Sequence, residues 1–362
     1  MRIVFLGLSV TSSWGNGHAT TYRALLSALH RQGHDLLFLE RDQPWYARHR
    51  DAPALEGCRV RIYDGLTDLK VRFTREVRSA DCVIVGSYVP DGIEVGEWVL
   101  GCAAGVVAFY DIDTPVTLAA LRAGTCRYLS PSLVKRYPLY LSFSGGPALE
   151  VLRDRHGAPD PRAFHCSADP SQYYPEPLTR RWDLGYLGTY SPDRQAMLEE
   201  LMLDPAREAP HERFVVAGPQ YPAKLCWPSN VERIEHLGPP LHRSFYNAQR
   251  FTLNVTRKDM TRLGYSPSVR LFEAAACGVP IISDRWDGLE TFFEVGSEIL
   301  VADSAAEVLR ILKELPEEER VAIGRRARER VLKEHTAAHR AAELELFIQE
   351  LANSVSKETV YL

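Results

Sequence analysis

Short apolar runs alternate with amphipathic stretches along the first part of the chain. Six of these runs have the length of buried strands: 3–7, 36–39, 59–63, 82–86, 106–110 and 139–143. Alternation of buried strands with helical periodicity is typical of a doubly wound parallel sheet. The pattern therefore predicts one Rossmann-like domain in this part of the chain.

The alternation resumes after a stretch rich in proline and tyrosine, 169–182, which shows no helical period and is typical of an extended linker. A strand from Asp183 is followed by apolar runs at 214–217, 231–234, 251–255, 279–283 and 299–301. The sequence thus predicts an α/β fold with Rossmann-like domains at 1–168 and 183–334. Residues 335–362 form the predicted C-terminal helix, with Asn353 as its stop.

Composition narrows the class of protein. A chain of 362 residues with 45% apolar and 25% charged residues is long enough for two domains with their own cores. Its net charge of -4 argues against nucleic acid or an anionic membrane as the partner. The apolar residues 3–8 are too few for a signal peptide or a membrane span. Seven scattered cysteines without a Cys-x-x-Cys motif favour a reducing, cytoplasmic location.

The densest chemistry lies in residues 264–284, which are predicted to form a loop, a short helix, a turn and a buried strand. Ser266 is expected to cap the helix, Pro267 to occupy its first position and Gly278 to end it. A helix N-terminus with Arg270 one turn inside is a ready anion site. Glu273 lies three residues later and could face the same ligand, toward sugar hydroxyls; a surface Arg270–Glu273 ion pair is the alternative.

A glycine-rich loop follows the first strand, where parallel sheets bind their ligands. It contains Trp14, Gly15, Asn16, Gly17 and His18, and its spacing does not fit the G-x-G-x-x-G fingerprint. His18 could act as a base or as a hydrogen-bond donor to a ligand. Its alternative role is to cap the helix that follows.

Asp111 and Asp113 follow the fifth strand as Asp-x-Asp. Two carboxylates can contribute to a divalent-cation site, but two oxygen ligands alone do not define one. Thr114-Pro115 opens a helix that Asp113 could cap. We therefore predict that the two carboxylates line a site or cap the helix, and that no metal is bound.

The 264–290 region resembles the nucleotide-sugar motif of GT-B glycosyltransferases, specifically the CgeB-like branch of the group-1 family. The resemblance is carried by Ser266, Arg270, Phe272-Glu273-Ala274, Ala276-Cys277-Gly278, Pro280 and Gly288-Leu289-Glu290. Many group-1 enzymes have a further glutamate eight positions before the motif glutamate. Tyr265 stands there in this chain, so the role of that carboxylate does not carry over.

The resemblance implies two Rossmann-like domains facing a cleft, and a C-terminal helix that crosses back to the first domain. It implies transfer of a sugar from a nucleotide-diphosphate donor, of UDP or dTDP type, to an unidentified acceptor. Arg270 and the helix N-terminus would stabilise the departing diphosphate, so no cofactor is required. The retaining or inverting outcome stays open.

The same resemblance divides the candidate residues between the two domains. The donor side consists of Gly188, Thr189, Tyr190, Gly218, Pro219, Arg257, Ser266, Ser268, Arg270 and Glu273. The acceptor side consists of Trp14–His18, Asp111 and Asp113. His18, Arg270 and Glu273 are the candidate catalytic residues.

Two other classes of protein fit the same donor site. A GT-B-fold nucleotide-sugar epimerase would turn over the donor without any acceptor. A non-catalytic nucleotide-sugar-binding protein would bind the donor without turnover. All three interpretations predict small-molecule partners.

Overall fold

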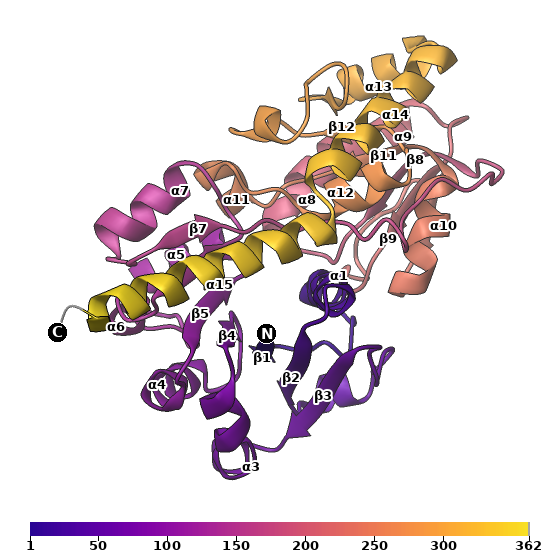
Figure 1. Ribbon diagram of the computed structural model, residues 1–362. Coiled ribbons are helices and arrows are strands. Elements are labelled where there is room, and N and C mark those ends of the chain that lie inside the picture. The colour runs from indigo at the N-terminus through magenta and orange to yellow at the C-terminus, as the bar shows by residue number, and fades with distance from the viewer. Residues whose placement is uncertain (361–362) are drawn as a thin grey trace. The chain divides into compact units, whose positions relative to one another are not determined.

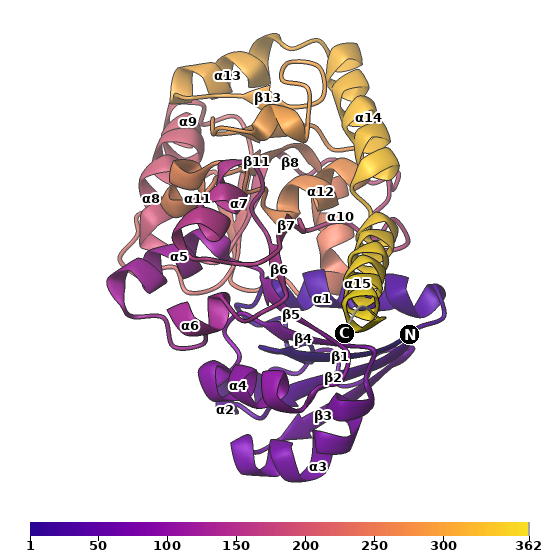
Figure 2. The same cartoon turned by 60° about the vertical axis from the view of Figure 1, so that its left-hand side comes forward.

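The computed structural model describes the backbone of residues 1–360 and the side chains of residues 1–354 (Figures 1 and 2). The chain forms two compact units. The first contains residues 1–166 and the chain from Ala337 onward, and the second contains Ser167–Thr336. Each unit has its own parallel sheet, so the predicted α/β fold is confirmed.

The sheet of the first unit has seven strands in the order β3-β2-β1-β4-β5-β6-β7. They are β1 (Arg2–Gly7), β2 (Asp35–Arg41), β3 (Cys58–Tyr63), β4 (Cys82–Gly86), β5 (Val106–Asp111), β6 (Leu139–Ser142) and β7 (Pro161–Ala163). All the pairings are parallel. The strand order reverses between β1 and β4, where ligands of such sheets bind beyond the carboxyl ends. The apolar runs had predicted every strand but β7.

The helices of the first unit follow the expected alternation. They are α1 (His18–Arg31), α2 (Pro44–Ala47), α3 (Leu66–Ser79), α4 (Gly92–Cys102), α5 (Thr114–Ala123), α6 (Pro131–Val134), α7 (Pro147–Glu150), the π-turn Val151–Arg155 and α15 (Ala337–Val360). Helix α15 lies alongside α1 and against β5 (Figures 1 and 2). The predicted stop at Asn353 is wrong, because no glycine or proline between it and Val360 interrupts the helix. Residues 361–362 of the predicted helix lie outside the described residues.

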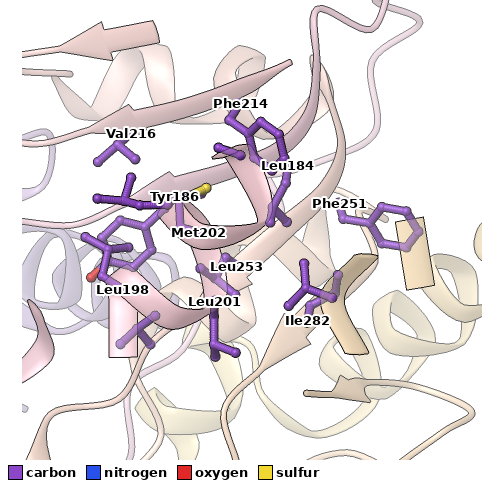
Figure 3. Close-up of a cluster of buried hydrophobic side chains, with 14 of the residues drawn as sticks. Leu184, Tyr186, Leu198, Leu201, Met202, Phe214, Val216, Phe251, Leu253 and Ile282 are labelled. Carbon is purple, nitrogen blue, oxygen red and sulfur yellow. The ribbon is translucent and has the colours of Figure 1, made fainter. Parts of the chain in front are cut away.

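The sheet of the second unit has six strands in the order β10-β9-β8-β11-β12-β13. They are β8 (Trp182–Leu187), β9 (Phe214–Ala217), β10 (Val231–Ile234), β11 (Gln249–Asn254), β12 (Ile281–Ser283) and β13 (Leu300–Val301). Alternate residues of neighbouring strands form one core, and Figure 3 shows Leu184, Tyr186, Phe214, Val216, Phe251 and Leu253 in it. This spacing of two fixes the sheet register, because a one-residue slip would turn every one of these side chains outward.

Helices connect the strands of the second sheet and extend beyond the last of them. They are α8 (Pro192–Leu198), the π-turn Glu199–Leu203, α9 (Asp204–Glu208), a 3₁₀ turn at Pro239–Leu241, α10 (His242–Asn247), α11 (Lys258–Leu263), α12 (Val269–Ala276), a 3₁₀ turn at Leu289–Thr291, α13 (Ala305–Glu314) and α14 (Glu317–Glu334). The stretch expected as a linker, 169–182, belongs by its contacts to this unit. Within the described residues, no helix is both long and apolar enough to cross a bilayer.

Candidate active site

Helix α12 begins later than the sequence predicted. Ser268, and not Ser266, is its N-cap residue, and Pro267 precedes the helix instead of occupying its first position. The cause is a turn in which Gly264 and Tyr265 both have positive φ, of 71° and 50°. The Ser266 hydroxyl is used within that turn, where it donates to the Gly264 carbonyl at 2.8 Å.

The N-terminal and C-terminal ends of α12 differ in the residues that surround them. Its first turn contains no acidic residue, so its own side chains do not neutralise the positive end of the helix. The Ser268 hydroxyl donates to Asn254 Oδ1 at 2.8 Å and does not cap the helix. At the other end Gly278 adopts a φ of 70° and stops the helix, as predicted.

Arg270 is held by three groups at the carboxyl edge of the second sheet. Its Nε donates to the Leu187 carbonyl at 2.6 Å and its Nη1 to Asn254 Oδ1 at 2.7 Å. Its guanidinium carbon lies 4.7 Å from the centre of the Tyr186 ring. A side chain that is only 6% exposed is not one half of a surface ion pair, so that alternative is wrong.

The remaining nitrogen of Arg270, Nη2, lies at the Gly188 turn. A Cβ on Gly188 would lie 2.5 Å from the Tyr186 hydroxyl and 3.0 Å from Nη2, so a glycine is needed for the chain to pass this close to both side chains. The planar guanidinium is thus fixed on two edges by acceptors and on one face by an aromatic ring, and its third edge lies against the loop after β8. Such a group can bind an anion with little further loss of side-chain entropy, because its orientation is already fixed.

The structure brings together the two predicted glycine turns, Gly188–Tyr190 and Gly218–Pro219. Gly188 N donates to the Ala217 carbonyl at 2.8 Å, and Tyr190 N donates to the Pro219 carbonyl at 3.0 Å. Gly218 has a φ of 142°, and a Cβ there would lie 2.0 Å from the Gly188 carbonyl oxygen. Both glycines are therefore required by the close approach of the two loops.

Arg233 fixes the second of these turns and was not predicted from the sequence. It lies on β10, and its guanidinium carbon lies 4.3 Å from the centre of the Tyr221 ring and 4.4 Å from the centre of the Trp227 ring. It donates to the carbonyls of Val216 and Gly218, the latter at 3.1 Å. Burial lowers the pKa of Arg233 from its usual value.

Two further arginines lie around the loop after β8. Arg194 Nη2 donates to the Thr189 carbonyl at 2.6 Å, and Arg257 Nε lies 3.5 Å from Asp193 Oδ2. Burial raises the pKa of Asp193, but the Ser191 hydrogen bond and the charges of Arg257 and Arg194 outweigh it and leave the pKa below its usual value. The predicted residues Thr189 and Arg257 thus lie in a region of positive potential.

Asp284 holds the chain at the carboxyl edge of the second sheet, and it too was not predicted from the sequence. It is buried at the end of β12 and accepts hydrogen bonds from Thr256 N and Thr256 Oγ1, at 3.0 and 2.8 Å. Burial raises its pKa to about 6. Asn254, which holds Arg270, donates in turn to Thr256 and Ser283. The network fixes Arg270 through Asn254.

Glu273 and Arg270 contact different groups within the protein, and the expectation that both meet one ligand stays a prediction. The Glu273 carboxylate is 3% exposed and accepts one hydrogen bond at each oxygen. Tyr173 donates to Oε1 at 2.9 Å and Tyr246 to Oε2 at 3.1 Å. His242 Nδ1 lies 3.8 Å from Oε2. The role of Glu273 toward a donor stays a prediction.

In the first unit, His18 is the first residue of α1, and Gly17 is the N-cap residue. Because Gly17 occupies the N-cap position, the alternative that His18 is the N-cap residue is wrong. The His18 ring packs against Tyr88 with 5.5 Å between ring centres, and the Tyr88 hydroxyl donates to Asp113 Oδ2 at 2.9 Å. The carboxyl edge of the first sheet therefore groups His18, Tyr88 and Asp113.

Asp113 occupies the N-cap position of α5, but its side chain does not cap the helix. Its carboxylate accepts from Tyr88, which has an unusual positive φ of 62°. A non-glycine residue in this conformation costs free energy and is often found at functional sites. Tyr88 is the partner that the sequence pattern did not reveal.

The glycine-rich loop before α1 is anchored on both sides. Asn16 Nδ2 donates to the carbonyls of Ser9 and Ser12, each at 3.0 Å, and Asn16 Oδ1 accepts from His18 N at 3.1 Å. Trp14 stacks on His49 with 4.3 Å between ring centres. Gly15 has a φ of 59°, and a Cβ on Gly17 would meet no atom within 4 Å. Asn16 therefore shapes the loop, and Gly17 borders open space.

Glu40 holds the same loop from the end of β2. Its buried carboxylate accepts from Val10 N at 2.7 Å, from Thr11 N at 3.0 Å and from the hydroxyls of Ser9 and Thr11. Four donors satisfy one buried charge, which is how an ionised group is tolerated inside a protein. Glu40 was not a candidate in the sequence, where it directly follows the apolar run 36–39.

Asp111 is fully buried, so the expectation that it lines the site is wrong. It accepts from Thr117 Oγ1 at 2.6 Å and from the Tyr140 hydroxyl at 2.7 Å. Burial raises the pKa of Asp111 to about 6, and the charge of Asp113 adds to the rise. Over the described residues, no three His, Cys, Asp or Glu side chains are grouped as metal ligands would be.

The pKa of Asp111 gives a test by pH. Folded protein holds this proton up to about pH 6, whereas an unfolded aspartate loses it near pH 4. The native state binds more protons in that window, so its stability falls as the pH rises from about 4 to 6, by about 3 kcal/mol from this group. Asp111→Asn is expected to lack this loss, as measured by urea unfolding at pH 4, 5, 6 and 7. Parallel stability curves for both proteins would contradict the assignment, because Asp284 titrates alike in each.

Comparisons with known proteins address the fold and part of the sequence. Residues 194–345 match the family model Glyco_trans_1_2, described as glycosyl transferase-like. No curated protein sequence matched the chain. A sucrose-phosphate synthase from Thermosynechococcus elongatus has a TM-score of 0.74 at 13% identity, covering 98% of this chain and 99% of that one. The fold is that of the GT-B glycosyltransferases.

Two further solved structures of this fold contain nucleotides. Anabaena HepE in complex with UDP-glucose has a TM-score of 0.70 at 13% identity, covering 98% of this chain and 100% of that one. An alpha-glucosyltransferase in complex with UDP and a 13-mer DNA has a TM-score of 0.73 at 16% identity, covering 96% and 99%. The predicted GT-B fold is confirmed, and the predicted glycosyltransferase class agrees with the family model over residues 194–345. The CgeB-like subtype stays a prediction.

Proposed function

We propose that the protein transfers a glycosyl group from a nucleoside-diphosphate sugar, of UDP or dTDP type, to a small-molecule acceptor without a metal. The observation that carries the proposal is Arg270, a buried guanidinium fixed by Leu187, Asn254 and Tyr186 with its third edge at the Gly188 turn. Next to it stands the start of α12, which has no acidic residue in its first turn. Structures of the same fold hold UDP or UDP-glucose, which supports this class of donor.

The donor site performs its chemistry by fixed charge. As the bond between the anomeric carbon and the diphosphate breaks, negative charge develops on the departing phosphate. Arg270 and the first N–H groups of α12 meet that charge, and the Gly188 and Gly218 turns hold the loop after β8 beside Arg270. Arg194 and Arg257 add positive potential around the same loop.

The acceptor side of the proposal rests on the first unit. The acceptor hydroxyl oxygen attacks the anomeric carbon, its proton passes to His18, and the nucleoside diphosphate leaves with the bonding electron pair. Tyr88 packs against the His18 ring and donates to Asp113, so both groups are held in place. A retaining transfer would need no protein base, and substitution of His18 separates the two mechanisms.

Nucleotide binding in the presence and absence of a chelator tests the proposal. UDP is expected to raise the melting temperature, because a ligand at about 100 times its Kd stabilises the folded state by about 2.7 kcal/mol. EDTA is expected to leave that shift unchanged, since arginine and backbone N–H groups balance the phosphate charge. Loss of the shift on chelation, with recovery in Mn²⁺, would refute metal independence. Turnover of a UDP-sugar without an acceptor would identify an epimerase instead.

A further inference from the structure

The segment that follows strand β4, residues 87–91, is here called the β4 loop, and it is anchored at both ends. Ser87 N donates to the Tyr110 carbonyl of β5 at 2.9 Å. At the other end, Asp91 forms an ion pair with Arg41, the last residue of β2. The β4 loop is therefore fixed to the carboxyl ends of two other strands of the first sheet.

Two residues of this loop, Tyr88 and Asp91, adopt positive φ, of 62° and 54°. Aspartate tolerates the left-handed conformation because its short side chain can form local hydrogen bonds, whereas a bulky residue is strained there. Such strain costs free energy and persists only where the surrounding structure holds it. The contacts of the Tyr88 side chain must therefore offset the strain of its backbone.

The Tyr88 side chain is held at its ring and at its hydroxyl. The ring centre lies 5.5 Å from that of His18 and 4.6 Å from that of Tyr128. The hydroxyl donates to Asp113 Oδ2 at 2.9 Å. Tyr128 is itself fixed, because its hydroxyl forms a hydrogen bond with Thr117 Oγ1 at 2.8 Å. The ring that contacts His18 is thus supported by a second ring and by a carboxylate.

The orientation of the His18 imidazole needs such support. Asn16 Oδ1 accepts from His18 N at 3.1 Å, which fixes the backbone at the start of α1 but not the side chain. Rotation about χ1 and χ2 would move the ring nitrogens. A general base acts only where its lone pair is within hydrogen-bond distance of the proton that it removes. The Tyr88 ring restricts that rotation.

We propose that Tyr88 is a positioning residue for the acceptor step: its ring, anchored through its hydroxyl by Asp113, orients the imidazole of His18 for removal of the acceptor proton. This role rests on the proposed function, in which His18 is the base. Tyr88 exchanges no proton with the acceptor, so its effect on the rate passes through His18. The left-handed backbone at Tyr88 directs the side chain toward both groups.

A double-mutant cycle tests this role through the release of UDP from UDP-glucose, with water as the acceptor. Tyr88→Phe keeps the ring and is expected to lower kcat about tenfold, the factor that corresponds to one hydrogen bond to a charged group. Tyr88→Ala is expected to lower kcat about 10²-fold, the cost of displacing a catalytic group by about 1 Å. In a His18→Ala background neither change should lower kcat further, because the group that Tyr88 positions is gone.

Two further measurements separate positioning from a general structural role. The Kd of UDP is expected to stay unchanged in every variant, since the donor residues belong to the other unit. Tyr63→Phe is the matched control, because Tyr63 ends β3 in the same unit and its buried hydroxyl has no hydrogen-bond partner among the described residues. It is expected to keep the wild-type kcat, and thermal melts confirm that each variant is folded.

Wild-type kcat in a folded Tyr88→Ala protein would overturn the positioning role. Losses that multiply in the His18→Ala background would overturn it as well, because Tyr88 would then act independently of His18. Full activity of His18→Ala alone would remove the proposed base. If the wild type neither binds UDP nor releases it from UDP-glucose, the proposed function itself fails and takes this role with it.

Discussion

Replacing Arg270 by lysine lowers kcat/KM for the UDP-sugar by about 10²–10³-fold, the loss found when one preorganised donor to a developing anion is removed. This is the first of the two largest effects that we expect. Lysine keeps the charge but has neither the planar fork nor a flat face for the Tyr186 ring. It cannot donate to Leu187 and Asn254 and still present a fixed edge at Gly188. The measurement is steady-state kinetics together with the Kd of UDP.

The matched control is Arg262→Lys. Arg262 lies on α11, its side chain is 74% exposed, and it pairs with Asp259 in the preceding turn. Such a surface pair contributes about 0–1 kcal/mol, so kinetics and UDP affinity are expected to stay at wild-type values. Wild-type kcat/KM in a folded Arg270→Lys protein would remove the fixed guanidinium from the proposed mechanism.

The strands could be predicted because burial on both faces leaves a continuous apolar run in the sequence. Cys82–Gly86 and Phe214–Ala217 are such runs, and both are strands in the structure. Strand β7 could not be predicted in this way. It has three residues, among them Pro161 and Arg162, and it pairs with β6 at the edge of the sheet. An edge strand tolerates proline and needs no apolar run.

The start of α12 was misplaced for a reason that local sequence does not contain. Ser266-Pro267 is a sequence pattern that is typical of a helix start, but Tyr265 N donates to the Asp287 carbonyl at 2.6 Å. That contact comes from a loop beyond the next strand and holds Gly264 and Tyr265 at positive φ. The helix cannot begin until Val269, because the turn uses the preceding residues.

The residues of the candidate site can likewise be divided into those with a local signal in the sequence and those without one. The Gly188 and Gly218 turns could be predicted from glycines that follow strands. Where two segments approach closely, a Cβ would clash, so the position is occupied by glycine. The roles of Arg233 and Glu40 have no such local signal in the sequence. Each side chain bonds to loop residues that are distant in sequence, and these contacts form only in the folded chain. The burial of Glu273 has the same origin, since Tyr173 is 100 positions away.

The second large effect is expected for His18→Ala, which should slow transfer by about 10²–10⁴-fold if His18 takes the acceptor proton. Its place supports this role, because the ring packs on Tyr88, which donates to Asp113, and because Gly17, not His18, is the N-cap residue of the helix. UDP affinity is expected to stay unchanged, since the donor residues belong to the other unit. The rate profile should also lose the acidic limb that a histidine base produces.

His30→Ala is the control, because His30 is an exposed residue in the last turn of the same helix. It reports any general effect of losing an imidazole from α1 and is expected to keep full activity. The pH profile separates catalysis from structure: a purely structural His18 would change the melting temperature and leave the shape of the profile intact. Full turnover in a folded His18→Ala protein would remove the base, and the acceptor proton would then leave through the departing diphosphate, as a retaining transfer allows.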